Sequence, residues 1–439
     1  MGVNFSGVSC ALALFFTVSG WGFVGKNNTE ATLTFDYTVD FPSDGKPTKA
    51  ATKEAIDDQL LYLYGPMQVA KAYGIPKGDH VTEVTKLEKL DGGMYRAAYH
   101  YSGTIQVKKG PKTHYSVKLP RTTVESEIYD KRCTDEHYPD FGDYWYFWNP
   151  DQSGCSLEEG VHYDTIKGDL VRIPNTELTY PEYDRLVDPQ TESIPIYVFF
   201  GKDEAEQKDD PFKSKDLNAQ AYRNFRANLV KMGFSEPEPM DDGEMNEHLA
   251  GQSFKRPFVE VTELTGKRAK MRVVLFFGNT GIDEKSDAFH YFYKIANEKS
   301  AILIYDGHSG LGGHLDPSAI EERHGFKIKM NRNQYQIFFF NSCTSYSYYN
   351  TLYFYRKAKK STRNLTKNLD IMTQGLAANF DEHARANVAL VRAVAIWAAG
   401  KKAPSYQKLA DQMDQNSLFG INGDEDNPTE MPKISLLAE

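Results

Sequence analysis

A cysteine and a histidine each follow an apolar, strand-like run in the second half of this chain. The run Ala301–Asp306 leads through one glycine to His308, and the run Gln336–Asn341 leads through one serine to Cys343. In open α/β sheets, ligands and reacting groups collect outside the carboxyl ends of the strands. A cysteine beside an imidazole forms a thiolate easily and becomes a nucleophile. The pattern therefore predicts that Cys343 is a nucleophile and that His308 is its acid–base partner.

The turn after the histidine could complete such a site. It runs Ser309-Gly310-Leu311-Gly312-Gly313, and a turn of this kind can direct backbone N–H groups at a substrate oxygen. Donors of this type stabilise the oxyanion of acyl transfer. We expect the Ser309 amide in this role, with the Gly310 amide in reserve. The glycine spacing matches neither dinucleotide-binding nor phosphate-binding loops, and no cofactor is expected.

The elements that must position these residues alternate between strands and helices. Continuous apolar runs predict the strands, and stretches of mixed polarity predict the helices between them. The strands are expected at 194–200, 256–264, 271–281, 301–306, 336–341 and within 369–380, and the helices at 217–234, 287–298 and 381–399. This order predicts an α/β domain over 194–400, with a mostly parallel sheet flanked by helices. Residues 401–439 would form a C-terminal extension.

The first half of the chain shows strand-like alternation instead, which predicts a β-rich N-terminal domain over 31–190. Apolar and polar residues alternate over 31–41, and the runs 94–107 and 114–119 flank a Gly-Pro turn. One helix is expected over 52–73, broken or kinked at Gly65-Pro66. The segment Asp143–Trp148 holds two of the four tryptophans. We interpret it as a buried aromatic cluster; the alternative is a binding surface.

The two motifs together resemble the caspase-like cysteine peptidases, the group of caspases, metacaspases, legumains, gingipains and clostripain. The resemblance covers roughly 194–400 and rests on a strand ending in a His-containing turn and the next strand ending in a small residue before Cys. It implies a caspase-like sheet and hydrolysis of peptide bonds after one selected side chain, with a protein or peptide as substrate. It also implies Cys343 as nucleophile, His308 as acid and base, and the amide after the histidine as oxyanion donor.

This chain departs from the family pattern at two positions. Ser309 stands where the family usually has glycine, which puts the oxyanion geometry in question. Ser342 stands where alanine is commoner. By analogy, the pocket for the substrate side chain would form from the loops after Phe200, Phe277 and Met372.

Two other classes of function use the same residues differently. Gly307-His308-Ser309-Gly310 partly resembles the nucleophile elbow of α/β-hydrolases, with Ser309 as the nucleophile of a serine esterase. Leu311 occupies the last glycine position of that motif, and no apolar helix follows. Alternatively, the protein is a non-catalytic envelope or binding protein, with Cys343 a small buried residue and His308 part of a loop.

The first residues of the chain and its cysteines indicate the compartment. Val8–Val24 carries no charge and resembles the apolar part of a signal peptide, although no basic residue precedes Lys26. We expect a signal peptide over 1–25 and export to the periplasm or the extracellular space. If the segment were retained, it would anchor the protein in a membrane.

Four cysteines are present, and Cys10 belongs to this leader. Cys133 and Cys155 are expected to form a disulfide in an oxidising compartment, which leaves Cys343 as the odd thiol. A zinc site made by these two cysteines with His137 and His162 is the alternative, but the spacing is irregular and no metal is expected.

Chain length and net charge limit the number of domains and the class of partner. At 439 residues the chain is too long for one ordinary domain, which favours two. The net charge of −9 argues against nucleic acid as a partner, because proteins that bind nucleic acid usually present a basic face.

Overall fold

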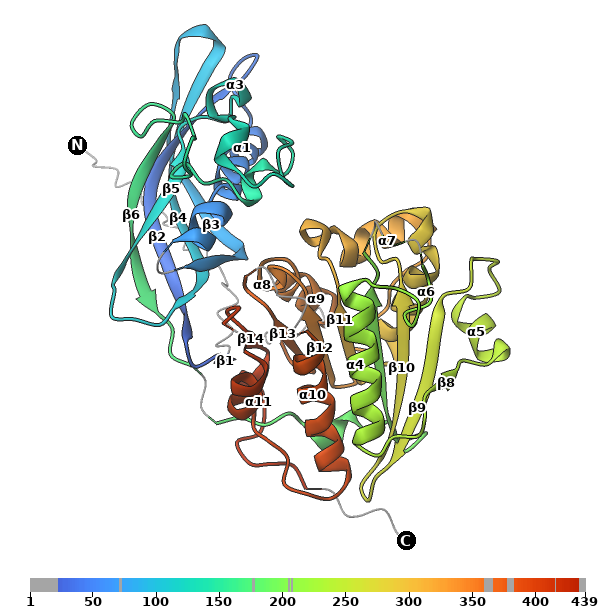
Figure 1. The fold of residues 1–439 in the computed structure, drawn as a ribbon. Coiled ribbons are helices and arrows are strands. Elements are labelled where there is room, and N and C mark those ends of the chain that lie inside the picture. The colour runs from blue at the N-terminus through green and yellow to red at the C-terminus, as the bar shows by residue number, and fades with distance from the viewer. Residues whose placement is uncertain are drawn as a thin grey trace, which may run out of the picture.

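The chain forms two sheets, each with its own hydrophobic core (Figure 1). The computed structural model describes residues 23–70, 73–175, 178–203, 206, 208–358, 366–376, 383–414 and 416–433. Cys10 and most of the apolar leader therefore lie outside the described residues. None of the helices described is long and apolar enough to cross a membrane.

The N-terminal sheet is antiparallel and has five strands in the order β3-β4-β2-β6-β5. Its strands are β2 Asn28–Pro42, β3 Gly74–Lys89, β4 Met94–Lys108, β5 His114–Pro120 and β6 Tyr163–Arg172. Buried and less buried residues alternate along β4 for most of its length, as expected for a sheet with one face against a core. The sequence predicted β2, β4 and β5 but not β3, an edge strand whose residues after Pro76 are mostly exposed.

Short helices cover one face of this sheet. They are α1 Lys49–Leu61, α2 Tyr64–Val69 and α3 Glu125–Ile128. The single helix expected over 52–73 is two helices, because the chain breaks ahead of Gly65-Pro66. Pro66 then occupies the first turn of α2, where a proline costs little since the N–H groups of that turn have no partner within the helix.

The second sheet has nine strands in the order β1-β14-β13-β12-β11-β7-β10-β9-β8. They are β1 Phe23–Val24, β7 Ser193–Gly201, β8 Glu238–Pro239, β9 Phe258–Thr265, β10 Lys270–Gly278, β11 Ile302–Asp306, β12 Gln336–Asn341, β13 Leu369–Thr373 and β14 Gly420–Asn422. The five central strands, β13 to β10, are parallel, and the outer strands pair antiparallel. A mixed α/β fold with a mostly parallel sheet, as predicted, is confirmed.

Helices cover both faces of the large sheet (Figure 1). One face packs on α4 Leu217–Lys231, α10 His383–Ala398 and α11 Tyr406–Met413. The other packs on α5 Asp242–His248, α6 Asp287–Lys299, α7 Pro317–His324 and α9 Asn350–Lys357. Alternate residues of β11 contribute to the cores on the two faces of the sheet. Ile302 and Ile304 belong to the core under α4 and α10, and Leu303 and Tyr305 belong to the core under α6 and α9. This explains why the central strands read as continuous apolar runs.

Segments from both ends of the described chain complete this sheet. Phe23 and Val24, at the end of the expected leader, pair with Ile421 and Gly420 of β14. In the expected C-terminal extension, α11 packs into the core and β14 pairs with β13. Both ends are therefore structural parts of the α/β half.

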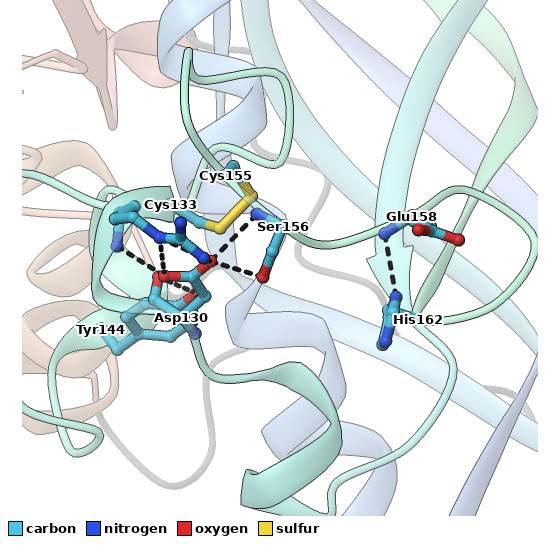
Figure 2. Close-up of polar contacts among 8 residues, drawn as sticks. Asp130, Cys133, Tyr144, Cys155, Ser156, Glu158 and His162 are labelled. Carbon is cyan, nitrogen blue, oxygen red and sulfur yellow. Dashed lines mark hydrogen bonds and ion pairs between the residues drawn. A yellow bond between two sulfur atoms is a disulfide. The ribbon is translucent and has the colours of Figure 1, made fainter.

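The predicted disulfide is confirmed. Cys133 and Cys155 are bonded, 22 positions apart in the chain. Figure 2 shows the pair beside Asp130, while His162 lies on a separate segment, where its Nδ1 accepts a hydrogen bond from the Glu158 amide. His137 contacts Asp135 instead. The two cysteines are thus engaged with each other, and the alternative of a zinc site made with these histidines is wrong.

Candidate functional site

The order of the central strands places the end of β11 at the point where the sheet reverses direction. In chain order the parallel strands β7, β10, β11, β12 and β13 lie in the spatial order 2-1-3-4-5. The chain therefore runs outward from β7 to β10 and then returns to the other side of β7 at β11. Sheets of this type bind ligands outside the carboxyl ends of the two strands at that reversal, here β7 and β11.

Strand register brings His308 and Cys343 to the same level. β11 and β12 are parallel neighbours, and Asp306 pairs with Asn341 as the last residue of each. His308 and Cys343 each follow two residues later. Since neighbouring strands lie about 4.8 Å apart, the two chain segments leave the sheet at the same level from adjacent strands. The structure thus places both predicted residues at one edge of the sheet, on adjacent strands.

The backbone at His308 is held by two hydrogen bonds to its carbonyl oxygen. Tyr305 OH donates to His308 O at 2.6 Å, and His314 Nδ1 donates to the same oxygen at 2.9 Å. Thr280 Oγ1 lies 2.9 Å from Tyr305 OH and extends this network to the loop after β10. The His308 side chain itself is 42% exposed. The turn is therefore fixed while the imidazole remains accessible to a substrate.

A carboxylate that the sequence analysis did not single out lies beside the histidine. Asp203 Oδ2 is 3.7 Å from His308 Nε2. Asp203 follows β7, the strand on the other side of the reversal. Its amide donates to Asp216, the residue that caps the N-terminus of α4, at 2.9 Å. Burial raises the pKa of Asp216, and its hydrogen bonds to the Asp203 and Asn218 amides oppose that rise.

A cavity of about 400 Å³ opens next to this pair. It is lined by Asp203, Glu206, Lys215, Asp216, Leu217, Asn218 and His308. Three of these side chains are carboxyls and one is a lysine. The loop after Phe200, one of the three from which a pocket was expected, therefore does contribute to a cavity beside His308.

The turn after His308 suits backbone donation. Ser309 has a φ of −82°, so a serine fits there without strain. Gly310 has a φ of +54°, and a Cβ at this position would lie 2.1 Å from Cδ2 of His314. Within the described residues, no backbone hydrogen bond is donated by the Ser309 or Gly310 amide. Residues Gly310–Leu315 form a 3₁₀ turn, whereas a nucleophile elbow leads directly into an α-helix.

Cys343 lies among tyrosines from both halves of the molecule. Burial raises the pKa of Tyr138 and Tyr146 of the N-terminal half, and the electrostatic interaction with Cys343 raises both further. The interaction with Cys343 also contributes to the raised pKa of Tyr305 and Tyr349 in the α/β half, again after burial. The cysteine is partly exposed. The candidate nucleophile therefore lies where the two halves meet.

The segment after the cysteine, residues 344–351, is bonded repeatedly to the N-terminal half. Tyr146 OH and Thr344 Oγ1 share a buried hydrogen bond of 3.0 Å, and Tyr346 OH donates to Glu30 Oε1 at 2.7 Å. Further along, Ser347 Oγ donates to Pro76 O and Thr351 Oγ1 donates to Asp79. Helix α8, Ser345–Tyr348, lies in this segment and packs against β3 (Figure 1).

The aromatic segment 143–148 is both a buried cluster and part of this contact. Tyr144, Tyr146 and Trp148 are buried, as the sequence indicated. Tyr146 also belongs to a hydrophobic cluster with Tyr64 and with Tyr346 of α8. The local sequence does not indicate this second role, because it depends on how the two halves pack.

A buried polar network lies directly beneath the strand ends. Asp306, Asn341 and Asn387 are fully buried, and Gln374 nearly so. Asn387 Nδ2 donates to Asp306 Oδ2, and Asn341 Nδ2 donates to Asn387 Oδ1 at 3.1 Å. Gln374 Nε2 donates to Asn341 Oδ1 at 3.2 Å. The network joins β11, β12 and the end of β13 to α10, and Asp306 takes part in it beneath the site.

A larger cavity lies elsewhere. It has a volume of about 1010 Å³ and is lined mainly by residues of α4, α10 and the segment 402–414. No residue from the ends of β7, β11 or β12 lines it. Chemistry, rather than volume, therefore marks the strand ends as the candidate site.

Comparison with known proteins does not assign the chain. Neither the scan against protein-family models nor the search of curated proteins finds a match.

Proposed function

We propose that this protein is a cysteine peptidase of the caspase-like type, with Cys343 and His308 as its catalytic residues. The observation that carries the proposal is the pairing of Asp306 with Asn341, from which His308 and Cys343 emerge at one level of adjacent parallel strands. A thiol and an imidazole carried at one level by two adjacent strands are the groups that nucleophilic acyl transfer needs.

The proposed reaction proceeds in two steps. The Cys343 thiolate attacks the carbonyl carbon of the peptide bond, and the developing oxyanion accepts hydrogen bonds from the Ser309 and Gly310 amides. His308 gives its proton to the leaving amine, and the C–N bond breaks to form a thioester. A water molecule then loses a proton to His308 and attacks the thioester, which releases the acid and restores the thiol. Asp203, 3.7 Å from Nε2, would stabilise the imidazolium.

The cavity beside His308 favours a cationic side chain. The lining has three carboxyl side chains, those of Asp203, Glu206 and Asp216, and only one ammonium group, that of Lys215. The substrate would therefore present a lysine or arginine to this cavity. Export of the enzyme to the periplasm or the extracellular space is part of the proposal, because its disulfide fits an oxidising compartment.

Peptide cleavage and thiol labelling test the proposal together. Fluorogenic peptides ending in Arg or Lys, and matched peptides ending in Ala or Asp, are incubated with the wild type, Cys343→Ala and His308→Ala. Each variant should lose at least about 10³-fold in kcat/KM. A peptide-based thiol probe should label the wild type and not Cys343→Ala.

His100→Ala is a matched control for the histidine. His100 is 44% exposed and lies 2.9 Å from Asp36, and it is on the N-terminal sheet, away from the cysteine strand. This variant should retain activity. Cleavage that persists in Cys343→Ala contradicts the proposal. Labelling by a fluorophosphonate that Ser309→Ala abolishes would indicate a serine esterase, and absence of both labels in folded protein would indicate a binding protein.

A further inference from the structure

Two histidines and an aspartate converge at the interface of α6 and α7. Asp287 and His290 lie one turn apart on α6, and His324 is the last residue of α7. One ligand atom from each lies within 4.8 Å of the other two. His290 is fully buried, and the side chain of His324 is 8% exposed. None of these residues takes part in the proposed peptide hydrolysis.

The spacing of the three ligand atoms suits a zinc-sized ion. His290 Nδ1 and His324 Nε2 share a hydrogen bond of 2.8 Å, which a bound ion would replace, and Asp287 Oδ1 lies 3.9 Å and 3.5 Å from these two nitrogens. Ligands at about 2.1 Å from a tetrahedral zinc ion lie about 3.4 Å from each other. The three distances therefore bracket one triangular face of such a tetrahedron.

The groups around the three residues are those that orient metal ligands. His290 Nε2 donates to Gly281 O at 2.8 Å, which leaves the Nδ1 lone pair directed at the cluster. Arg323 Nε donates to Asp287 Oδ1 at 2.7 Å and holds that carboxylate in place. The His324 ring stacks on Phe326, with centroids 5.1 Å apart, and meets Tyr291 edge-on. A histidine that binds a metal usually donates its other ring N–H to a carbonyl or carboxylate, and a carboxylate that binds a metal is usually hydrogen-bonded as well.

The cluster is connected to the turn that carries the candidate catalytic histidine. Gly281, whose carbonyl oxygen accepts from His290, lies near His314, since a Cβ built at Gly281 would be 3.8 Å from His314 Nε2. His314 in turn donates to His308 O. An ion that fixed α6 against α7 would therefore support the loops on which His308 is positioned.

From this geometry we infer that Asp287, His290 and His324 bind one divalent zinc ion, with water at the remaining position. The residue types are a borderline-soft set of two imidazoles and one carboxylate, which suits Zn²⁺ and Co²⁺ better than Mg²⁺ or Ca²⁺. The site is distinct from Cys343 and His308, and it does not depend on the peptidase proposal.

The test uses the full chain without a polyhistidine tag and with Cys343→Ala, because a thiol and imidazole at the candidate active site could themselves bind zinc. Metal-free protein is titrated with Zn²⁺ by calorimetry and with Co²⁺ by visible absorption. We expect one ion per chain, the absorption bands of tetrahedral Co²⁺, and a Tm about 5 °C higher with zinc in excess, reversed by a chelator.

Variants locate the ion. Asp287→Asn and His324→Gln should each weaken zinc binding at least about tenfold and weaken the Co²⁺ bands, while His100→Gln should leave both unchanged. If His324→Gln does not fold, Asp287→Asn alone tests the site. Asp287 is partly exposed, and the native fold of this variant can be checked by circular dichroism. Absence of zinc binding in the Cys343→Ala protein, or binding unchanged in folded Asp287→Asn and His324→Gln, would overturn the inference.

Discussion

The two sheets of this molecule use their faces differently. In the N-terminal sheet, alternate residues of β4 are buried, so that one face packs on a core and the other is more open. In the α/β sheet, every residue of β11, β12 and β13 is buried, because helices cover both faces. A sheet of the second kind has only its strand ends left for chemistry. That difference explains why the candidate site lies beyond Asp306 and Asn341.

The two halves also differ in how they are stabilised. The N-terminal half has the disulfide Cys133–Cys155, and no second disulfide occurs among the described residues. The α/β half instead has hydrogen-bonded amides and a carboxyl buried at the ends of its central strands. The experiments below test this contrast, beginning with the largest expected effect.

Asn387→Ala should be the most damaging change. It removes the amide that donates to Asp306 and accepts from Asn341, and it leaves both groups buried without that partner. The free energy of unfolding should fall by about 4 kcal/mol, and peptidase activity should fall with it. Denaturant unfolding measures the change. Asn224→Ala, on the exposed side of α4, is the control and should shift stability by less than about 0.5 kcal/mol.

Cys155→Ser should weaken the N-terminal half selectively. Opening a disulfide loop of 22 residues costs about 3 kcal/mol in the chain-entropy model. Hydrogen exchange should become faster across β2–β6 and change little in β7 and β10–β13. Cys343→Ser, which replaces the third cysteine of the described chain, is the control and should leave exchange in the N-terminal sheet unaltered. Equal acceleration in both sheets would show that the halves unfold as one unit.

Lys357 should give the α/β half a pH dependence. Burial lowers the pKa of Lys357 to about 7, although its ammonium donates to Asn331 O and to Gln336. An unfolded lysine has a pKa of about 10.4, so the unfolded chain binds more protons between these two values. Stability therefore rises as pH rises through this window. From pH 7 to pH 9.5, the wild type should gain about 2–3 kcal/mol relative to Lys357→Met, measured by denaturant unfolding at each pH. Parallel pH profiles for the two proteins would contradict this expectation.

Tyr146→Phe should have the smallest effect on stability, about 1 kcal/mol, because it removes one hydrogen bond between the halves. Its functional effect should be specific, since Thr344 follows the candidate nucleophile. The rate at which iodoacetamide alkylates Cys343 should change several-fold. Tyr144→Phe is the matched control, because Tyr144 OH bonds to Asp130 within the N-terminal half. If both variants alter alkylation equally, the Tyr146–Thr344 contact has no special role.

Local sequence pattern predicted the central strands well because burial on both faces makes them continuous apolar runs. The predicted strand over 301–306 is observed as Ile302–Asp306, and the one over 336–341 is observed with the same bounds. β3 was not predicted, since an edge strand with exposed, charged residues lacks the alternation that identifies strands. The caspase-like identity of the α/β half stays a prediction.

The candidate site was predictable only in part. Cys343 and His308 end apolar runs, which the sequence displays directly. Asp203 also follows a buried strand, β7, but its place beside His308 depends on β7 and β11 being neighbours. The bonds from Glu30 and Tyr146 to the segment after Cys343 join residues about 200 or more positions apart, and nothing in the local sequence encodes them.

The short strand β1 has a consequence for where the chain can be trimmed. Phe23 and Val24 form the outer strand of the nine-stranded sheet and cover β14. Removal of the whole leader expected over 1–25 would delete this strand and leave the backbone N–H and C=O groups of β14 as an open edge, whereas a chain that begins at or before Phe23 keeps it. Open edges recruit strands from other molecules. A protein shortened by these few residues would therefore be prone to self-association, and soluble expression would depend on starting no later than Phe23.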